Sequence, residues 1–373
     1  MEARYAGDTV AVIGGGVMGL CTAVELSEQG TAVELFERST IANKHGGSGG
    51  VGRIFRLTYP EPEMVSLLAE TIPLWDRLEG RLDQRLRSIT GGLDYGDDAA
   101  TERFSQALMA CGQDYRWIDE SDAAAAWPDL ELNSRVLWQP DAAVIHSERV
   151  LSACVNSLRE RGVAVHEETC VDALVLSGDR VELTIDGQTR DFSQVVVCAG
   201  GHTNELCSEF FDLPTIRTTQ EFTLSFDCDP QGDPFPIACD YRIPPMPGES
   251  YFWLPCEPGR MKVGAFATGA MIELSQAGEG ECPAQLEEVL RSYASATFTG
   301  GGPLINAELA PCTYDFSPDE WFYARAAADG RVIAAGGFSG HGFKFAPYVA
   351  GCLSHAISSR GSEMPIGLPW SPA

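Results

Sequence analysis

Thr9–Gly19 reads TVAVIGGGVMG and joins a short apolar run to a turn of closely spaced glycines. The β-branched run Thr9–Ile13 predicts a buried strand, and Gly14, Gly16 and Gly19 match the pattern G-x-G-x-x-G. Such glycines let the phosphates of a dinucleotide approach the backbone at the start of a helix. The stretch therefore predicts the first strand and helix of a Rossmann-type nucleotide-binding fold.

The segment that follows completes this unit. Apolar residues recur at helical spacing after Gly19, and Gly30 supplies a helix stop. A second strand is expected at Ala32–Phe36, and it leads into Glu37, the acid that would accept hydrogen bonds from a ribose. We assign Glu37 and the adjacent Arg38 to the cofactor site. This pattern does not choose between FAD and NAD.

A second glycine-rich stretch lies near the end of the chain. Val332–Pro347, VIAAGGFSGHGFKFAP, predicts a buried strand, a loop and then a helix that begins near Lys344. Gly337, Gly340 and Gly342 would let backbone N–H groups approach a ligand closely, and a helix start favours anionic groups. Taken alone, the stretch also fits an ordinary glycine-rich turn. Together with the N-terminal turn, it predicts one large cofactor held from both ends of the chain.

Composition narrows the class of protein. A chain of 373 residues suits two lobes, and 44% apolar with 21% charged residues is typical of a globular enzyme. The net charge of −27 argues against nucleic acid or anionic membranes as partners. No apolar run is long enough to cross a bilayer and no signal-peptide pattern opens the chain, so we expect a cytoplasmic protein. The twelve cysteines lack metal-site and disulfide-framework spacing, and we expect neither.

The order of the expected elements indicates a discontinuous nucleotide-binding domain. We assign residues 1–86, 147–216 and 305–373 to this domain, and residues 87–146 and 217–304 to a β-rich substrate domain. A long amphipathic stretch runs from Met64 to about Leu86, and a helix is expected over Ser147–Arg161. Strands are expected at 164–166, 173–177, 181–185, 194–200, 251–254 and 260–266.

Five motifs carry a family resemblance. They are GRIFRLTY (Gly52–Tyr59), the LW and LE pairs in Leu74–Glu79, TGGLDYG (Thr90–Gly96), PCTYDFSPDEWF (Pro311–Phe322) and GFSGHGFKF (Gly337–Phe345). Together they resemble the monomeric sarcosine oxidase family of FAD-dependent amine oxidases. That family includes N-methyltryptophan oxidase, pipecolate oxidase and an imino-acid oxidase of nikkomycin biosynthesis, and the segment before Tyr59 is somewhat more similar to the last of these.

The resemblance implies a fold, a cofactor and a reaction. The fold would be α/β and two-lobed, of the glutathione-reductase/p-hydroxybenzoate-hydroxylase type, with a Rossmann-type FAD domain and a β-rich substrate domain. The cofactor would be FAD rather than NAD. The enzyme, a monomer, would oxidise the C–N bond of a secondary amino acid to an imine, with O2 as the acceptor and hydrogen peroxide as the product.

The resemblance also carries residue roles. Arg56 and Lys344 match the family's pair that binds the substrate carboxylate, and Arg53 matches a second arginine close to the flavin. Lys262 matches the lysine that activates oxygen, and Cys312 matches the cysteine bonded covalently to the flavin 8α position. A planar guanidinium binds a carboxylate through two parallel bonds and an ammonium adds a point charge, so the residue types suit these roles.

Each assignment has a plainer alternative from the residues alone. The two arginines could form surface or interdomain salt bridges, and the two lysines could be solvated. Cys312 could be a buried thiol without a flavin bond. We interpret His341 as a structural or flavin-proximal residue and not as a catalytic base.

Some positions depart from the family pattern. Gly49 and Gly50 replace paired histidines before the arginines, and Phe266 replaces a histidine four residues after Lys262. The family's substrate-contacting tyrosine falls at Phe252, with Tyr251 beside it, and we assign both to substrate binding. These changes remove polar groups and favour a bulkier or cyclic substrate over sarcosine.

Two other functions stay open at this point. One is a flavin dehydrogenase that passes electrons to an acceptor other than oxygen. The other is a flavin-binding protein without turnover, which would have no need of a carboxylate-binding pair. An NAD-linked dehydrogenase is disfavoured by the C-terminal glycine-lysine segment.

Overall fold

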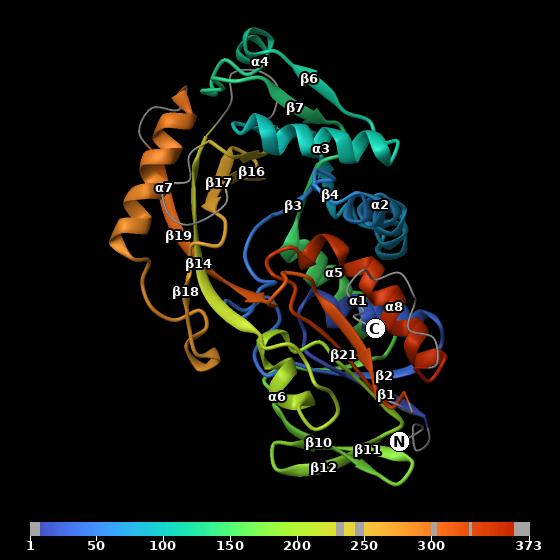
Figure 1. Ribbon diagram of the computed structural model, residues 1–373. Coiled ribbons are helices and arrows are strands. Elements are labelled where there is room, and N and C mark those ends of the chain that lie inside the picture. The colour runs from blue at the N-terminus through green and yellow to red at the C-terminus, as the bar shows by residue number, and fades with distance from the viewer. Residues whose placement is uncertain (1–7, 229–234, 243–249, 300–303, 328–329, 362–373) are drawn as a thin grey trace.

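The computed structural model describes residues 8–228, 235–242, 250–299, 304–327 and 330–361. Two sheets, each with its own helices, lie next to each other in the molecule (Figure 1). The fold is α/β, as the sequence predicted. None of the helices within the described ranges is both long enough and apolar enough to cross a bilayer.

The predicted first strand lies inside a six-stranded sheet with the order β20-β21-β13-β1-β2-β9. β1 pairs in parallel with both β13 and β2, and β20 is an antiparallel edge strand. The strands are β1 (Thr9–Ile13), β2 (Ala32–Phe36), β9 (Ala164–His166), β13 (Gln194–Val197), β20 (Tyr323–Ala326) and β21 (Val332–Gly336). The start, middle and end of the chain therefore all contribute to this nucleotide-binding sheet.

Alternation along β1 sends its side chains into two different cores. Val10 and Val12 pack with the helices on one face, whereas Ala11 and Ile13 pack with a three-stranded sheet on the other. The helices are α1 (Val17–Glu28), α5 (Ser147–Glu160) and α8 (Ala346–Ser358), and the small sheet is β10 (Val171–Ser177), β11 (Arg180–Ile185) and β12 (Gln188–Phe192). Figure 1 shows the nucleotide-binding sheet between these two layers.

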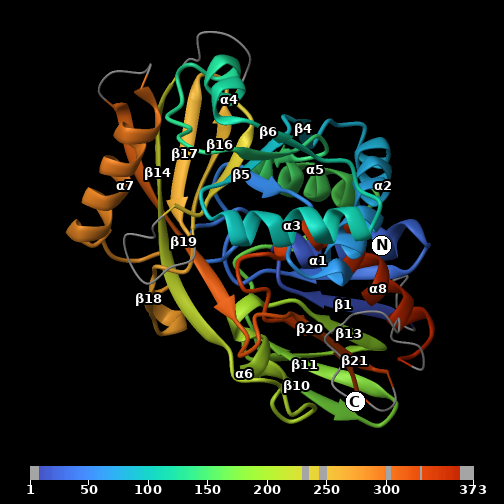
Figure 2. The same cartoon turned by 45° about the horizontal axis from the view of Figure 1, so that its top comes forward.

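The second sheet is larger and forms the other lobe. Its order is β18-β14-β17-β16-β15-β5-β7-β6, and β19 pairs with β14. The strands are β5 (Gly92–Tyr95), β6 (Arg116–Ile118), β7 (Val136–Gln139), β14 (Arg217–Asp227), β15 (Ile237–Asp240), β16 (Tyr251–Glu257), β17 (Arg260–Ala265), β18 (Ala270–Met271) and β19 (Ile305–Phe316). Helix α7 (Ala284–Thr297) packs its apolar side chains on one face of this sheet, and Figure 2 shows it beside β14 and β19.

The remaining elements are a short sheet and several helices and turns. A short sheet of β3 (Arg53–Phe55), β8 (Ala143–Ile145) and β4 (Arg87–Ile89) lies near helix α2 (Pro62–Leu82). Helices α3 (Asp98–Ala110), α4 (Glu120–Ala126) and α6 (Thr203–Cys207) and short 3-10 turns at 200–202, 274–276 and 342–345 complete the fold. All twelve cysteines are free thiols.

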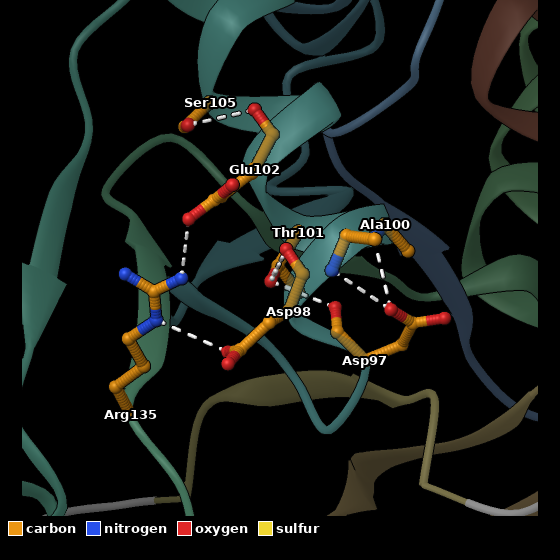
Figure 3. Close-up of polar contacts among 8 residues, drawn as sticks. Asp97, Asp98, Ala100, Thr101, Glu102, Ser105 and Arg135 are labelled. Carbon is orange, nitrogen blue, oxygen red and sulfur yellow. Dashed lines mark hydrogen bonds and ion pairs between the residues drawn. The ribbon is translucent and has the colours of Figure 1, made fainter.

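The start of α3 shows how local chemistry fixes an element. Asp97 is its N-cap, and the carboxylate accepts hydrogen bonds from the backbone N–H groups of Ala99 and Ala100. Arg135, before β7, pairs with Asp98 at 3.1 Å and with Glu102 at 2.7 Å (Figure 3). Because both acids lie in the first turns of α3, these contacts attach the start of the helix to the segment that leads into β7.

Most expected elements are confirmed, although several begin or end a few residues away from the expected position. Gly30 follows the end of α1 with φ +81° and provides the predicted stop. The amphipathic helix ends at Leu82, four residues earlier than its pattern suggested, because Asp83 adopts a left-handed conformation with φ +48°. Lys344 lies in a 3-10 turn that precedes α8, and not at the first residue of that helix.

One segment lies apart from its predicted domain. β19 opens the segment 305–373 but is paired along its length with β14 in the large sheet. Within that segment, residues 328–329 and 362–373 lie outside the described residues. The domain boundaries themselves stay a prediction.

Candidate active site

A cavity of about 880 Å³ lies between the nucleotide-binding sheet and the large sheet. Both glycine-rich turns, the end of β2 and one face of the large sheet contribute to its lining. The cavity brings together these sequence-predicted residues: Gly14, Gly16, Glu37, Arg38, Arg53, Arg56, Phe252, Lys262, Cys312, Gly340, Gly342 and Lys344. Gly19, Tyr251 and Gly337 are not among its lining residues.

The N-terminal glycine turn is suited to a phosphate group. A Cβ at Gly14 would lie 2.3 Å from the carbonyl oxygen of Cys198, so the turn tolerates no side chain there. A Cβ at Gly19 would lie 1.9 Å from the carbonyl oxygen of Gly14, which gives Gly19 a packing role between helix and turn. The first turn of α1 carries no acidic residue, and its start faces the cavity. A pyrophosphate would therefore meet the positive end of the helix dipole without repulsion.

Glu37 and Arg38 lie at the end of β2. The Glu37 carboxylate accepts hydrogen bonds from the backbone N–H of Gly15 at 2.7 Å and of Ser39 at 2.9 Å. Arg38 Nη1 lies 2.6 Å from Nε2 of His202. Because an arginine only donates, His202 accepts through Nε2 in this pair. These residues supply the donors and acceptors that the adenosine half of a dinucleotide requires, so the site fits FAD.

The C-terminal glycine loop closes the other side of the cavity. Gly340 has φ +74°, and a Cβ there would lie within 3.0 Å of the rings of Tyr314 and Phe266. Gly337, with φ +71°, serves the turn itself and packs near Tyr323. The loop can therefore pass close to the aromatic wall of the cavity because it lacks side chains at these points.

The large sheet presents a row of residues to the cavity. Neighbouring strands align Asp94, Cys239, Phe252, Gly264 and Thr223 in register, which places these five residues on one face. Cys239, Phe252 and Thr223 all line the cavity. The pairing register of the five strands therefore brings these residues, which are distant in sequence, to one face of the sheet.

Tyr251 falls on the opposite face from this row. Successive side chains alternate along a strand, so Tyr251 points away when Phe252 faces the cavity. The Tyr251 ring stacks on Tyr293 of α7 with centroids 3.7 Å apart, inside the core of the lobe. The structure thus places Phe252 at the cavity and gives Tyr251 a packing role, contrary to our assignment of both residues to substrate binding.

Arg56 is held by acceptors on neighbouring segments. Its Nη1 donates to the hydroxyl of Thr58 at 2.8 Å and pairs with Asp94 at 3.1 Å. The two charged side chains are 15% and 3% exposed, so the pair is shielded from solvent. Among the described residues, every hydrogen bond from Arg56 leaves from Nη1. Nε and Nη2 are then left for a ligand in the cavity.

Lys344 belongs to a buried polar cluster centred on Tyr59. Its Nζ donates to the Tyr59 hydroxyl at 2.9 Å and to the carbonyl of His341 at 3.2 Å. The same hydroxyl lies 2.8 Å from Nδ1 of His341. Burial, together with the nearby Arg56 guanidinium, lowers the pKa of Lys344 to about 7. Burial and these two cations hold the pKa of His341 well below its usual range, so its ring is neutral at physiological pH.

Lys262, Arg53 and Cys312 form a second group in the cavity. Lys262 Nζ donates to the carbonyls of Val51 and Gly52, the latter at 2.7 Å. Burial, together with Arg53, lowers the pKa of Lys262 to about 7. Burial raises the pKa of Cys312, and the charges of Arg53 and Lys262 oppose this shift. A cation that is buried and held by two carbonyls is suited to stabilise negative charge that develops beside it.

Sequence reasoning missed four residues of the site. Tyr59, Cys239 and Tyr241 line the cavity, and Asp94 lies behind it as the partner of Arg56. Asp94 offered a signal, since it is a lone acid between Leu93 and Tyr95 in the motif Thr90–Gly96. The others required the three-dimensional register, because Tyr59 and Lys344 are 285 residues apart in the chain.

Comparison with known proteins identifies the family. The model of the family described as FAD dependent oxidoreductase (DAO) matches residues 9–356, which is most of the chain. The chain belongs to this DAO family. The match includes the glycine turn, the large sheet and the C-terminal loop, so all parts of the cavity lie within the DAO region.

Among DAO relatives, two curated proteins are similar over nearly their whole length. Monomeric sarcosine oxidase of Bacillus sp. (strain B-0618) is 26% identical over 96% of this chain and 94% of its own. N-methyl-L-tryptophan oxidase of Yersinia pestis (strain Pestoides F) is 27% identical over 90% of this chain and 91% of its own.

Solved DAO-type structures agree with the fold. A variant of NikD, described as an unusual amino acid oxidase essential for nikkomycin biosynthesis, has a TM-score of 0.86, 23% identity and coverage of 97% of this chain and 96% of its own. L-proline dehydrogenase from P. horikoshii has a TM-score of 0.81, 18% identity and coverage of 96% and 95%. The same fold thus serves proteins named as oxidase and as dehydrogenase, so it does not choose the electron acceptor.

Proposed function

We propose that this protein is an FAD-dependent oxidase of a secondary amino acid, N-alkylated or cyclic, acting on the bond between nitrogen and the adjacent carbon. The organic product would be an imine, and O2 would be reduced to hydrogen peroxide. When bound, FAD supplies an acceptor at N5 for the hydride that leaves the carbon next to nitrogen. The convergence of Arg56 and Lys344 on one cavity wall is the observation that carries this proposal.

The two cations would hold the substrate carboxylate. Arg56 would bind through Nε and Nη2, since Asp94 and Thr58 already occupy Nη1. Lys344, which lies near the other end of the sequence, would add a second positive charge on the same cavity wall. With the carboxylate fixed, the neighbouring carbon has a defined position, which lowers the entropic part of the barrier.

The same cations would help to keep the substrate amine neutral. An ammonium group has no lone pair to support loss of a hydride, and nearby positive charge disfavours it. The neutral ring of His341 and the hydroxyl of Tyr59 complete this polar wall without adding a carboxylate base to the cavity lining there. The substrate would therefore react as its neutral amine.

Lys262 and Cys312 would serve the oxidant and the cofactor. Lys262 would stabilise the negative charge that develops on O2 as it accepts electrons. Cys312 would hold the cofactor through a thioether to the 8α position. Both residues line the cavity. The charge of the nearby Arg53 would favour anionic species in the part of the cavity next to Lys262 and Cys312.

The aromatic wall bears on the substrate side chain. Phe252, Phe266 and Tyr314 line the cavity, and Phe266 lies 5.2 Å from His341 between ring centroids. Such a lining favours apolar or ring-containing substrates, because each buried apolar group gains free energy on leaving water.

The test is anaerobic mixing of the FAD-loaded protein with a panel of N-methyl and cyclic amino acids, followed by air. The proposal predicts that at least one substrate bleaches the flavin absorbance and that air restores it with release of peroxide. Bleaching without rapid recovery in air would favour a dehydrogenase. No bleaching by any member of the panel would favour a non-catalytic flavin protein.

A further inference from the structure

We propose that Gly264 is a specificity-determining residue, because its lack of a side chain lets the Phe252 ring lie over the backbone of Gly264 and leaves depth for a bulky, flat substrate. This proposal rests on the function proposed above and deepens it. The substrate class is a secondary amino acid whose ring or apolar side chain packs against Phe252.

The close approach of the two residues is the first observation. Phe252 on β16 and Gly264 on β17 are directly paired in register. A Cβ built on Gly264 would lie 2.3 Å from Cζ of Phe252 and 2.7 Å from its Cε1. Carbon atoms in contact are normally about 3.5–4.0 Å apart, so any side chain at Gly264 would displace the ring by more than about 1 Å.

The direction of this displacement follows from the neighbours. Cys239 occupies the other flank of Phe252 in the same row, and the backbone of the sheet lies beneath the ring. Leu254 and Ile237 pack beside the ring in a small apolar cluster. The cavity that Phe252 lines is the remaining side. A displaced ring would therefore move toward the bound substrate.

Backbone strain plays no part at this position. Gly340 at the cavity has a φ of +74°, whereas Gly264 is not among the glycines with a positive φ. Gly264 lies within a regular strand, where glycine is usually disfavoured because it adds no packing. Its absence of a side chain is thus explained by the aromatic ring lying across it.

The experiment compares Gly264→Ala with wild type. Binding of acetate, benzoate and 2-naphthoate to the FAD-loaded protein is followed by the flavin absorbance. We expect Gly264→Ala to weaken 2-naphthoate binding by at least about tenfold and acetate binding by less than about threefold. The double variant Gly264→Ala/Phe252→Ala should regain 2-naphthoate binding. Gly80→Ala, where a Cβ meets nothing within 4 Å, is the matched control and should bind all three as wild type does.

A crystal structure of Gly264→Ala tests, independently of any binding measurement, whether a side chain at this position displaces the Phe252 ring. A Phe252 ring displaced into the cavity would support the proposal. An unmoved ring, or equal weakening of all three carboxylates, would overturn it. If wild type bound none of the carboxylates, the proposed function would fail, while the ring position would still decide the role of Gly264.

Discussion

The titration of Lys344 gives a quantitative prediction about carboxylate binding. Its Nζ is buried beside Tyr59, His341 and Arg56, and its pKa in the free protein is lowered to about 7. A bound carboxylate stabilises the protonated form, so binding above this pKa requires uptake of a proton. Affinity should therefore be full below about pH 7 and should fall as pH rises.

The size of the effect follows from that pKa. For a ligand that binds protonated Lys344 and does not itself titrate, such as benzoate, Kd rises in proportion to one plus the ratio of neutral to protonated lysine. With a pKa of about 7, this ratio predicts a rise of about 90-fold between pH 6 and pH 9. The groups next to Lys344 do not titrate in this range, since Arg56 stays charged, His341 stays neutral and burial raises the pKa of Cys239 to about 11. Lys262 in the same cavity also has a pKa of about 7, so its contribution is measured separately with Lys262→Met.

The measurement is the Kd of benzoate from the flavin absorbance at several pH values. Lys344→Met should raise Kd at about pH 6 by roughly 10- to 150-fold, the worth of a charge-assisted hydrogen bond of about 1.5–3 kcal/mol. It should also remove the pH dependence. Lys262→Met is the control, because Lys262 bonds to the carbonyls of Val51 and Gly52 and should leave the slope intact. A flat profile in wild type, or the wild-type slope in Lys344→Met, would refute this reasoning.

Three further predictions concern other parts of the molecule. Lys262→Met should slow reoxidation of the reduced protein by O2 at least about tenfold while reduction by the amine changes little; stopped-flow traces in which both steps slow equally would contradict its role. After acid precipitation the yellow colour should stay with the wild-type pellet and leave the Cys312→Ala pellet, and a colourless wild-type pellet would mean that no thioether forms. Asp97→Ala should lower the free energy of unfolding by about 1 kcal/mol in urea titrations, because two backbone N–H groups of α3 lose their acceptor; an unchanged midpoint would show that Arg135 alone holds this helix start.

Local patterns were sufficient to predict the nucleotide-binding unit. Thr9–Gly19 and Glu37 belong to one strand, turn, helix and strand, whose hydrogen bonds and apolar spacing are set within a few residues. The same holds for strands β16 and β17, which were expected at 251–254 and 260–266. The bounds of α2 were not, since the left-handed conformation of Asp83 has no strong signature in its sequence.

The site itself depended on long-range register. Sequence alone could not say which of Tyr251 and Phe252 faces the cavity, because that depends on which face α7 covers. The pairing of Arg56 with Asp94 and the cluster around Tyr59 join segments that only the fold brings together. The family resemblance identified the cationic residues of the site. Their hydrogen-bond and ion-pair partners, and the row of residues on the large sheet that faces the cavity, could be found only in the structure.

The most direct test is a crystal structure of the FAD-loaded protein with benzoate. We predict the carboxylate within about 3 Å of both the Arg56 guanidinium and Lys344 Nζ, with its ring against Phe252. A carboxylate bound elsewhere, or one that contacts neither cation, would contradict the proposed site.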